Sequence, residues 1–230
     1  MPLGDSITDI VCWRAYLWDR LQNTGYANVD FVGSVRGERP GGCDVPGYDK
    51  DNEGHSGLLA VHTVALNLLP TWLRQNPPDI VTMHLGSNDI GHGYKIEQIL
   101  HAFSKLVGQM RDANPRMKII VAQILPLYAI GFEAKVLELN SRIPLWAKSM
   151  STSESPIIVV DQHSGFGLAD FRDGVHPNDA GDKKMAENWY PALVAAVHAV
   201  QTGRERGGLQ EQLGHERQLL YEESKRRKGA

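Results

Sequence analysis

The protein has 230 residues, of which 42% are apolar and 22% are charged, a composition typical of one or two globular domains. Its 24 Lys and Arg against 27 Asp and Glu give a formal net charge of −3, which argues against a dedicated nucleic-acid binder or a protein drawn to anionic membranes. No stretch approaches the roughly 20 apolar residues that a membrane-spanning helix needs, and the first residues lack a charged leader followed by an apolar run. We therefore expect neither a nucleic-acid partner nor a membrane partner.

Short apolar runs alternate with longer segments of helical periodicity, a pattern that predicts an α/β fold with a parallel sheet covered by helices on both faces. The expected strands are a stub at Pro2-Leu3 and the runs 29–35, 80–85, 118–124 and 157–161. The expected helices are 10–21 (capped by Thr8 or Asp9), 61–74, 96–110, 133–149 and 179–200. Three prolines within these helices are expected to kink or split them: Pro70, Pro144 and Pro191.

Two segments differ in composition from the rest. Residues 33–57 are rich in Gly and poor in apolar side chains, which predicts a long functional loop. From residue 203 the sequence turns to Glu, Arg, Gln and Lys, so we expect one domain over 1–202 and a solvated helix or loose tail over 203–230. The two cysteines, Cys12 and Cys43, are either free thiols or one disulfide that would tie the long loop down.

Ser6 lies where the first strand ends and a helix begins, so its hydroxyl should project from a tight turn at the carboxyl edge of the sheet. This geometry suits a hydrolase nucleophile, although the sequence is not Gly-x-Ser-x-Gly, and Asp5 and Ser6 have a second interpretation as helix caps. Asp173 and His176 are three residues apart, a spacing that can supply a base and its orienting carboxylate or only a hydrogen-bonded loop.

Acyl transfer also needs hydrogen-bond donors for the developing oxyanion. Asn88 follows a buried strand and should emerge at the same edge as Ser6, and Gly57 can present a backbone N–H without obstruction. The N–H of Ser6 is the natural third donor. Taken singly, Gly57 and Asn88 are also common turn formers.

The blocks Gly-Asp-Ser, Gly, Gly-x-Asn-Asp and Asp-x-x-His occur in this order, and over residues 1 to about 200 the chain resembles the GDSL, or SGNH, hydrolases. The resemblance implies a three-layer α/β/α sandwich with a flavodoxin-like central parallel sheet, and chemistry without a metal or other cofactor. It also implies that Ser6 is the nucleophile, His176 the base and Asp173 its orienting residue. The oxyanion donors would then be Ser6, Gly57 and Asn88.

The sequence around these blocks is similar to the family-three carbohydrate esterases, which are acetyl xylan esterases; the similar segments are 1–8, 12–14, 52–57 and 173–191. The resemblance implies removal of O-acetyl groups from acetylated xylan or xylooligosaccharides by an extracellular, secreted enzyme, which we expect to be a monomer. The first strand of that family is usually longer, so we expect either a missing N-terminal piece or a truncated strand.

Four residues beside the blocks are expected to contact the substrate: Asp5, Trp13, His55 and Asp89. Trp13 also lies on an apolar helix stripe, which is typical of core packing. His84 and His92 could ligate a metal together with Asp89, but His84 lies within an apolar strand, which favours a hydrogen-bonded role in the core.

Three other functions stay open. A lipase-like enzyme or thioesterase would use the same serine on longer acyl chains. A metal-dependent phosphoesterase would use a different set of side chains: Asp5, Asn88, Asp89, His92, Asp173 and His176. A carbohydrate-binding module would bind sugar without releasing acetate.

Overall fold

The computed structural model describes residues 1–128 and 131–228, with side chains as far as Arg204. Its strands are β1 (Pro2–Gly4), β2 (Glu53–Gly54), β3 (Ile80–His84), β4 (Lys118–Gln123) and β5 (Ile157–Asp161). Its α-helices are α1 (Ser6–Asp9), α2 (Trp13–Asn23), α3 (Ala60–Ala65), α4 (Leu69–Gln75), α5 (Ser87–Gly91), α6 (Ile96–Ala113), α7 (Glu133–Met150) and α8 (Asp179–Lys228), and a 3₁₀ helix spans Leu168–Asp170.

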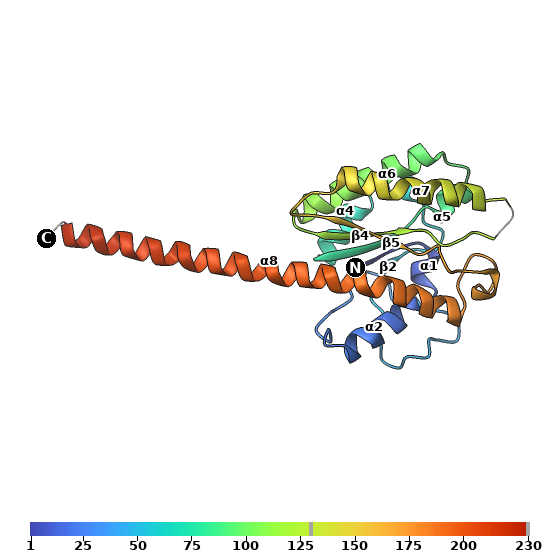
Figure 1. Ribbon diagram of the computed structural model, residues 1–230, viewed down its shortest axis with the longest axis horizontal. Helices are drawn as coiled ribbons and strands as arrows, with labels where there is room; N and C mark the ends of the chain where they lie inside the picture. The colour runs from blue at the N-terminus through green and yellow to red at the C-terminus, as the bar shows by residue number, and fades with distance from the viewer. Residues whose placement is uncertain (129–130, 229–230) are drawn as a thin grey trace.

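The five strands form one parallel sheet in the order β2-β1-β3-β4-β5. Successive side chains of β4 point to opposite faces, so that Ile119 and Val121 pack with α4, α6 and α7, whereas Ile120 and Ala122 pack with α2 and α8. Figure 1 shows these two helical layers on either side of the sheet. The predicted α/β class with three layers is therefore confirmed.

One expected strand is wrong and one observed strand was not expected. Residues 29–35 form no strand; the Phe31 N–H is held by the Asp49 carboxylate at 2.7 Å, and only Val35 pairs, in an isolated antiparallel bridge with Asn52. Instead, the end of the predicted loop supplies β2, which pairs with β1 through Leu3 and Glu53. The apolar residues of 29–35 pack beside the sheet without joining it.

The helices follow the apolar periodicity, with corrections at their ends. The first expected helix is two elements, because α1 already begins at Ser6 and α2 begins only at Trp13, with no side-chain cap from Thr8 or Asp9. Pro70 splits the segment 61–74 into α3 and α4 by lying in the first turn of α4. Helices α7 and α8 continue through Pro144 and Pro191.

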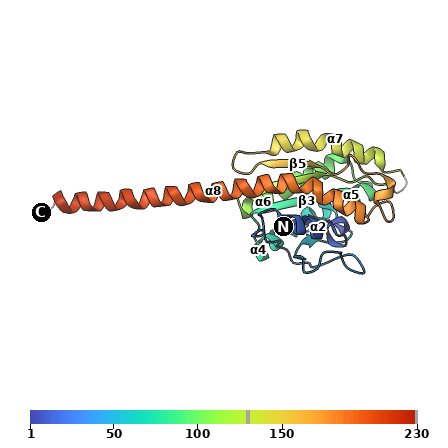
Figure 2. The same ribbon diagram turned by 60° about the horizontal axis from the view of Figure 1, so that its bottom comes forward.

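Helix α8 packs on α2 and the sheet with its first half and then extends away from the domain, as both views show (Figures 1 and 2). The helix continues to Lys228. Within the described residues, no helix combines the length and the apolar character required to cross a bilayer.

Candidate active site

Ser6 is the first residue of α1 and lies two residues after the end of β1 at Gly4. The Asp5 carboxylate accepts the Ile7 N–H at 2.9 Å and caps the helix, so the capping interpretation holds for Asp5. The turn is compact, because a Cβ atom on Gly4 would lie 2.1 Å from the Thr8 hydroxyl oxygen. The Ser6 hydroxyl thus emerges from a tight strand-to-helix turn at the carboxyl edge of the sheet.

The loop before α8 brings an imidazole and a carboxylate to this hydroxyl. The His176 Nε2 atom lies 2.8 Å from the Ser6 Oγ atom, and the His176 Nδ1 atom lies 2.8 Å from the Asp173 Oδ2 atom. The other Asp173 oxygen accepts the backbone N–H groups of Val175 and His176 at 3.0 and 2.8 Å. The three side chains therefore form a continuous relay from carboxylate to hydroxyl.

The charge on Asp173 is strongly favoured. Burial alone would raise the pKa of this carboxyl, but hydrogen bonds from the backbone and ring of His176 and from the Val175 N–H outweigh burial and lower the pKa to about 2. Asp173 consequently stays ionised at neutral pH and can accept a hydrogen bond from the imidazole Nδ1–H group, which fixes the ring and leaves Nε2 to face the serine.

Asn88 in α5 and the turn at Gly57 lie next to the serine turn. The Asn88 amide nitrogen donates to the Asp5 carboxylate at 3.2 Å and to the Leu58 carbonyl at 3.1 Å, which joins three loops of the sheet edge. Gly57 has a φ of +81° and is exposed. In the described part of the chain, no hydrogen bond engages the backbone N–H of Gly57 or of Ser6, so both are free to donate to a ligand.

The structure places two of the residues expected to contact substrate, Asp5 and Asp89, in buried positions where their carboxylates have protein partners. Asp89 accepts the N–H groups of Ala60 and Val61 at 2.9 and 3.0 Å and so caps α3. Asp5 is held by Ile7 and Asn88, as described above. Burial raises the pKa of Asp89, and it raises the pKa of Asp5 to about 7. Their roles are in local structure.

Trp13, also expected to contact substrate, lies in the core. The side chain is 1% exposed, its indole N–H donates to the Ile7 carbonyl at 2.7 Å, and its ring packs 5.8 Å from that of Trp189. The apolar stripe was the better guide, and Trp13 belongs to the core between α2 and α8.

His55 remains accessible beside the Gly57 turn. Its imidazole is 31% exposed, stacks on Trp72 with ring centres 4.4 Å apart, and lies 2.7 Å from the buried Glu53 carboxylate through Nε2. Of the four residues expected to contact substrate, it is the one whose side chain a ligand can reach.

The suggested metal ligands do not converge. His84 is buried, its Nε2 atom accepts the Leu125 N–H at 3.3 Å, and burial lowers the pKa of its imidazole to about 4. His92 turns to the Asn88 carbonyl at 2.8 Å, while Asp89 caps α3. Throughout residues 1–128 and 131–204, no three His, Cys, Asp or Glu side chains are grouped to hold a metal ion.

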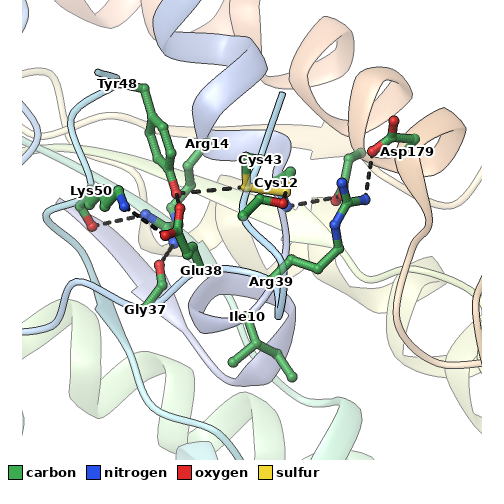
Figure 3. Close-up of a disulfide and its surroundings, with 12 residues drawn as sticks. Ile10, Cys12, Arg14, Gly37, Glu38, Arg39, Cys43, Tyr48, Lys50 and Asp179 are labelled. Atoms are coloured by element: carbon green, nitrogen blue, oxygen red, sulfur yellow. Dashed lines mark hydrogen bonds and ion pairs between the residues drawn. A yellow bond between two sulfur atoms is a disulfide. The ribbon is translucent and has the colours of Figure 1, made fainter. Parts of the chain in front are cut away.

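Cys12 and Cys43 form a disulfide, which settles the two alternatives left open by the sequence (Figure 3). The bridge attaches the long loop to the start of α2. Beside it, the buried Arg14 guanidinium donates to four backbone carbonyls, those of Thr8, Asp9, Gly37 and Lys50. Arg39 in the same loop pairs with Asp179 at 2.5 Å, so three separate links hold this loop against the domain.

Sequence reasoning missed residues that hold the loops around the site in place without belonging to the proposed relay. Asp9 and Ser56 are joined by a hydrogen bond of 2.7 Å, and Arg14 and Glu53 are buried charges with several partners. A charged residue within an apolar helix pattern, as at Arg14, was a usable signal for burial with partners. Nothing in the local sequence connects Asp9 with Ser56, because that contact depends on the pairing of β1 with β2.

Comparisons with known proteins agree with this architecture. Residues 3–184 match the GDSL-like lipase/acylhydrolase family. A multidomain esterase of Ruminococcus flavefaciens is 32% identical over a match that covers 86% of this chain, and the chain spans 29% of the length of that relative.

Two solved structures are each 38% identical to this chain. One is an acetyl esterase with a serine-to-alanine substitution and an acetate ion (TM-score 0.82, covering 87% of this chain and 98% of the other). The second is a carbohydrate esterase of family 3 from Talaromyces cellulolyticus (TM-score 0.81, covering 86% and 97%). The sheet order, the two helical layers and these similarities identify the SGNH hydrolase fold, and the match over most of the domain shows that the chain belongs to the GDSL-like lipase/acylhydrolase family.

Proposed function

We propose that the protein is a serine esterase that removes O-acetyl groups from acetylated xylan or xylooligosaccharides. The observation that carries the proposal is the relay of two 2.8 Å contacts from Asp173 through His176 to Ser6. A hydroxyl, an imidazole and an ionised carboxylate in this arrangement are the parts needed to generate a serine nucleophile at neutral pH.

In the proposed reaction, the Ser6 oxygen attacks the acetyl carbonyl while His176 Nε2 accepts the serine proton. Asp173 holds the ring and stabilises the imidazolium that forms. The sugar oxygen then leaves with the proton from His176, and the acetyl group stays on Ser6. A water molecule, deprotonated by His176, attacks the acetyl-serine and releases acetate, and the serine recovers its proton.

The tetrahedral oxyanion would be stabilised by the N–H groups of Ser6 and Gly57 and by the side-chain amide of Asn88. Two features support this assignment. The two backbone N–H groups have no protein acceptor in the described residues, and Asn88 Nδ2 lies next to the serine turn, where it donates to Asp5 and Leu58. Since an amide nitrogen has two protons, Asn88 would exchange one of these bonds for the oxyanion, whereas the two backbone donors are free before the reaction starts.

The acetyl and carbohydrate specificity is inferred from the relatives, which include an acetyl esterase and a family 3 carbohydrate esterase. A lipase-like or thioesterase activity is the alternative within the same family. A series of soluble esters of increasing acyl length separates the two, because an acetyl esterase should lose kcat/KM steeply beyond the two-carbon acyl group.

We further propose that the enzyme is secreted and acts as a monomer without a cofactor. A disulfide is compatible with an oxidising compartment.

The deciding experiment compares acetate release from acetylated xylooligosaccharides by the wild type and by Ser6→Ala. We expect the variant to lose at least about 10³-fold in kcat, because the other groups of a triad retain little activity without the nucleophile. Ser141→Ala is the matched control, since Ser141 lies on the exposed side of α7 and its hydroxyl donates to the Glu138 carbonyl within the same helix. Undiminished acetate release by a folded Ser6→Ala protein would show that Ser6 is not the nucleophile.

A further inference from the structure

We propose that Asp9 is a positioning residue, which directs the Gly57 N–H toward the oxyanion by holding the hydroxyl of Ser56. The inference rests on the proposed function, because it assigns Asp9 and Ser56 a part in the same reaction. It concerns residues that do not touch the substrate and act only through the orientation of one peptide group.

The Gly57 N–H belongs to the central peptide of a four-residue turn. The turn begins at His55, whose N–H donates to the Gly4 carbonyl at 3.0 Å, and closes with the Leu58 N–H on the His55 carbonyl at 2.9 Å. The φ of +81° at Gly57, its third residue, is the mark of a type II turn. In the related type I turn the peptide between Ser56 and Gly57 is turned over, so its N–H points to the opposite side.

A glycine at this position does not by itself select between the two turns, because glycine adopts positive and negative φ about equally well. The closing hydrogen bond does not select either, since both turn types have it. A further contact has to fix the central peptide. The only side chain attached to that peptide is that of Ser56, and its hydroxyl donates to the Asp9 Oδ2 atom at 2.7 Å.

The acceptor is held more firmly than its partial exposure suggests. The Asp9 carbonyl accepts a hydrogen bond of 3.0 Å from the buried Arg14 guanidinium. The backbone of Gly37 approaches the carboxylate so closely that a Cβ atom there would lie 1.8 Å from Asp9 Oδ1, and Gly54 leaves no room for a Cβ atom beside the Asp9 N atom. Because the acceptor is charged and already ordered, little entropy is lost when Ser56 binds it.

This link joins two of the proposed oxyanion donors. Asp9 is the last residue of α1 and Ser6 is the first, whereas Ser56 directly precedes Gly57. One hydrogen bond therefore sets the turn that carries the Gly57 N–H relative to the helix that carries the Ser6 N–H. Loss of the bond should let the turn populate its flipped form, in which the oxyanion has one donor fewer.

The test uses the full chain and compares Asp9→Ala, Ser56→Ala and the double variant on p-nitrophenyl acetate. Rates are divided by the number of active sites, titrated with diethyl p-nitrophenyl phosphate. We expect each single variant to lose about 10-fold in kcat, less than the 10² to 10³ that follows complete loss of an oxyanion donor. KM should change by less than about twofold, since the Gly57 N–H that Asp9 orients binds the oxyanion, which forms only in the transition state.

Three further measurements distinguish positioning from general destabilisation. The double variant should lose no more than either single variant, because both remove the same contact. The inhibition constant of an alkylboronic acid, which forms a tetrahedral anion on a reactive serine, should rise by the same factor as kcat falls. Asp9→Asn keeps an acceptor for the Ser56 hydroxyl and should stay within about threefold of the wild type. Asp19→Ala, which removes an exposed carboxylate that binds Asn23 on α2, is the control and should leave kcat unchanged.

The inference is wrong if Asp9→Ala and Ser56→Ala retain the wild-type kcat per titrated site, or if their losses multiply in the double variant. It is also wrong if the whole effect lies in KM or in the fraction of titratable sites. A wild-type protein that neither releases p-nitrophenol from the ester nor reacts with the phosphate would instead refute the proposed function itself.

Discussion

At the scale of single residues, the proposed esterase reaction depends on three donors to the oxyanion. Asn88 is the one that donates through its side chain, so a substitution removes it directly. Replacing Asn88 by Ala should lower kcat by about 10² to 10³, because a donor to the oxyanion is lost. The measurement is the steady-state rate on p-nitrophenyl acetate per titrated site. Asn88→Ala also removes the contacts to Asp5 and Leu58, so thermal unfolding has to accompany it. An Asn88→Ala protein that is folded and as fast as the wild type would exclude this donor.

Gly57 offers a second test at the same scale. Its φ of +81° disfavours alanine by about 1–2 kcal/mol, although a Cβ atom there would meet nothing within 4 Å. Gly57→Ala should therefore leave the fold intact and turn the peptide over, with a loss of kcat. Gly25→Ala is the matched control, because Gly25 has a φ of +88°, equal free space and a place far from the serine, after α2. Equal activities in the two variants would contradict a role for the Gly57 N–H.

At the scale of elements, three strands could be predicted, including the edge strand β5, whereas the opposite edge strand β2 could not. The runs that became β3, β4 and β5 are rich in β-branched residues and pack against helices on both faces of the sheet, so their sequence carries the signal for a parallel strand. Strand β2 is only Glu53 and Gly54, which have no strand preference, and it exists because β1 offers Leu3 and Gly4 as partners. The apolar run 29–35 has the strand signal, but only Val35 forms a bridge, with Asn52.

The candidate site divides in the same way. Ser6, Asn88 and the Asp173–His176 pair stand at short motifs, each of which alone has a second, purely structural interpretation. The order of the motifs and the family resemblance it carries allowed the sequence to bring them together. The burial of Trp13 and Asp89 was harder to predict from the sequence than the motif residues were. A side chain next to a motif points to the cleft or to the core according to how distant helices pack. The Ser56–Asp9 contact is likewise a product of sheet pairing.

The long loop between α2 and β2 is the element whose stability is most open to test. The Cys12–Cys43 bridge closes a segment of 31 residues, for which loop entropy predicts about 3–4 kcal/mol of stabilisation. The Cys12→Ser/Cys43→Ser protein should lose about this much free energy of unfolding in urea. Dithiothreitol should lower the free energy of unfolding of the wild type to that of the double variant, and it should leave the free energy of unfolding of the variant unchanged. Identical unfolding curves for both proteins without reductant would show that Arg14 and Arg39 hold the loop without help from the bridge.

At the scale of the whole molecule, the chain is one α/β/α domain with a helical extension. We propose that residues 1–202 are the catalytic domain and that 203–230 are an appendage. Trp189, Leu193 and Val197 of α8 are buried against the domain, and near the boundary Arg204 pairs with Asp79 at 2.8 Å. Beyond that pair the helix extends away from the domain (Figure 1). Because the charged relay lies at the opposite end of α8, the extension has no direct route to the chemistry.

Buried carboxyls make the stability of the whole domain depend on pH. Asp182 in α8 is fully buried; one oxygen accepts the Cys12 N–H at 3.0 Å, and the other has no partner in the described residues. Burial raises its pKa to about 7, against the smaller opposing effects of the Cys12 N–H, Arg39 and Arg172. Between pH 4 and 7 the folded protein therefore holds a proton that the unfolded chain has released. The contribution of Asp182 to stability is complete below pH 4 and is lost as the pH rises through about 7.

Asp182→Asn removes this titration and keeps an oxygen for the Cys12 N–H. Relative to the wild type, the variant should gain stability as the pH rises from 5 to 8, by up to about 1.4 kcal/mol per pH unit below pH 7. The difference between the two proteins is the informative quantity, because Asp5 titrates with the same sign and His84 with the opposite sign in both. Urea unfolding at each pH measures it. Glu97→Gln is the control: the pKa of Glu97 is lowered by its hydrogen bond to Arg142, so this variant should gain nothing over the wild type as the pH rises. A stability difference between Asp182→Asn and the wild type that stays constant from pH 5 to 8 would mean that Asp182 ionises in the folded protein as it does in the unfolded chain.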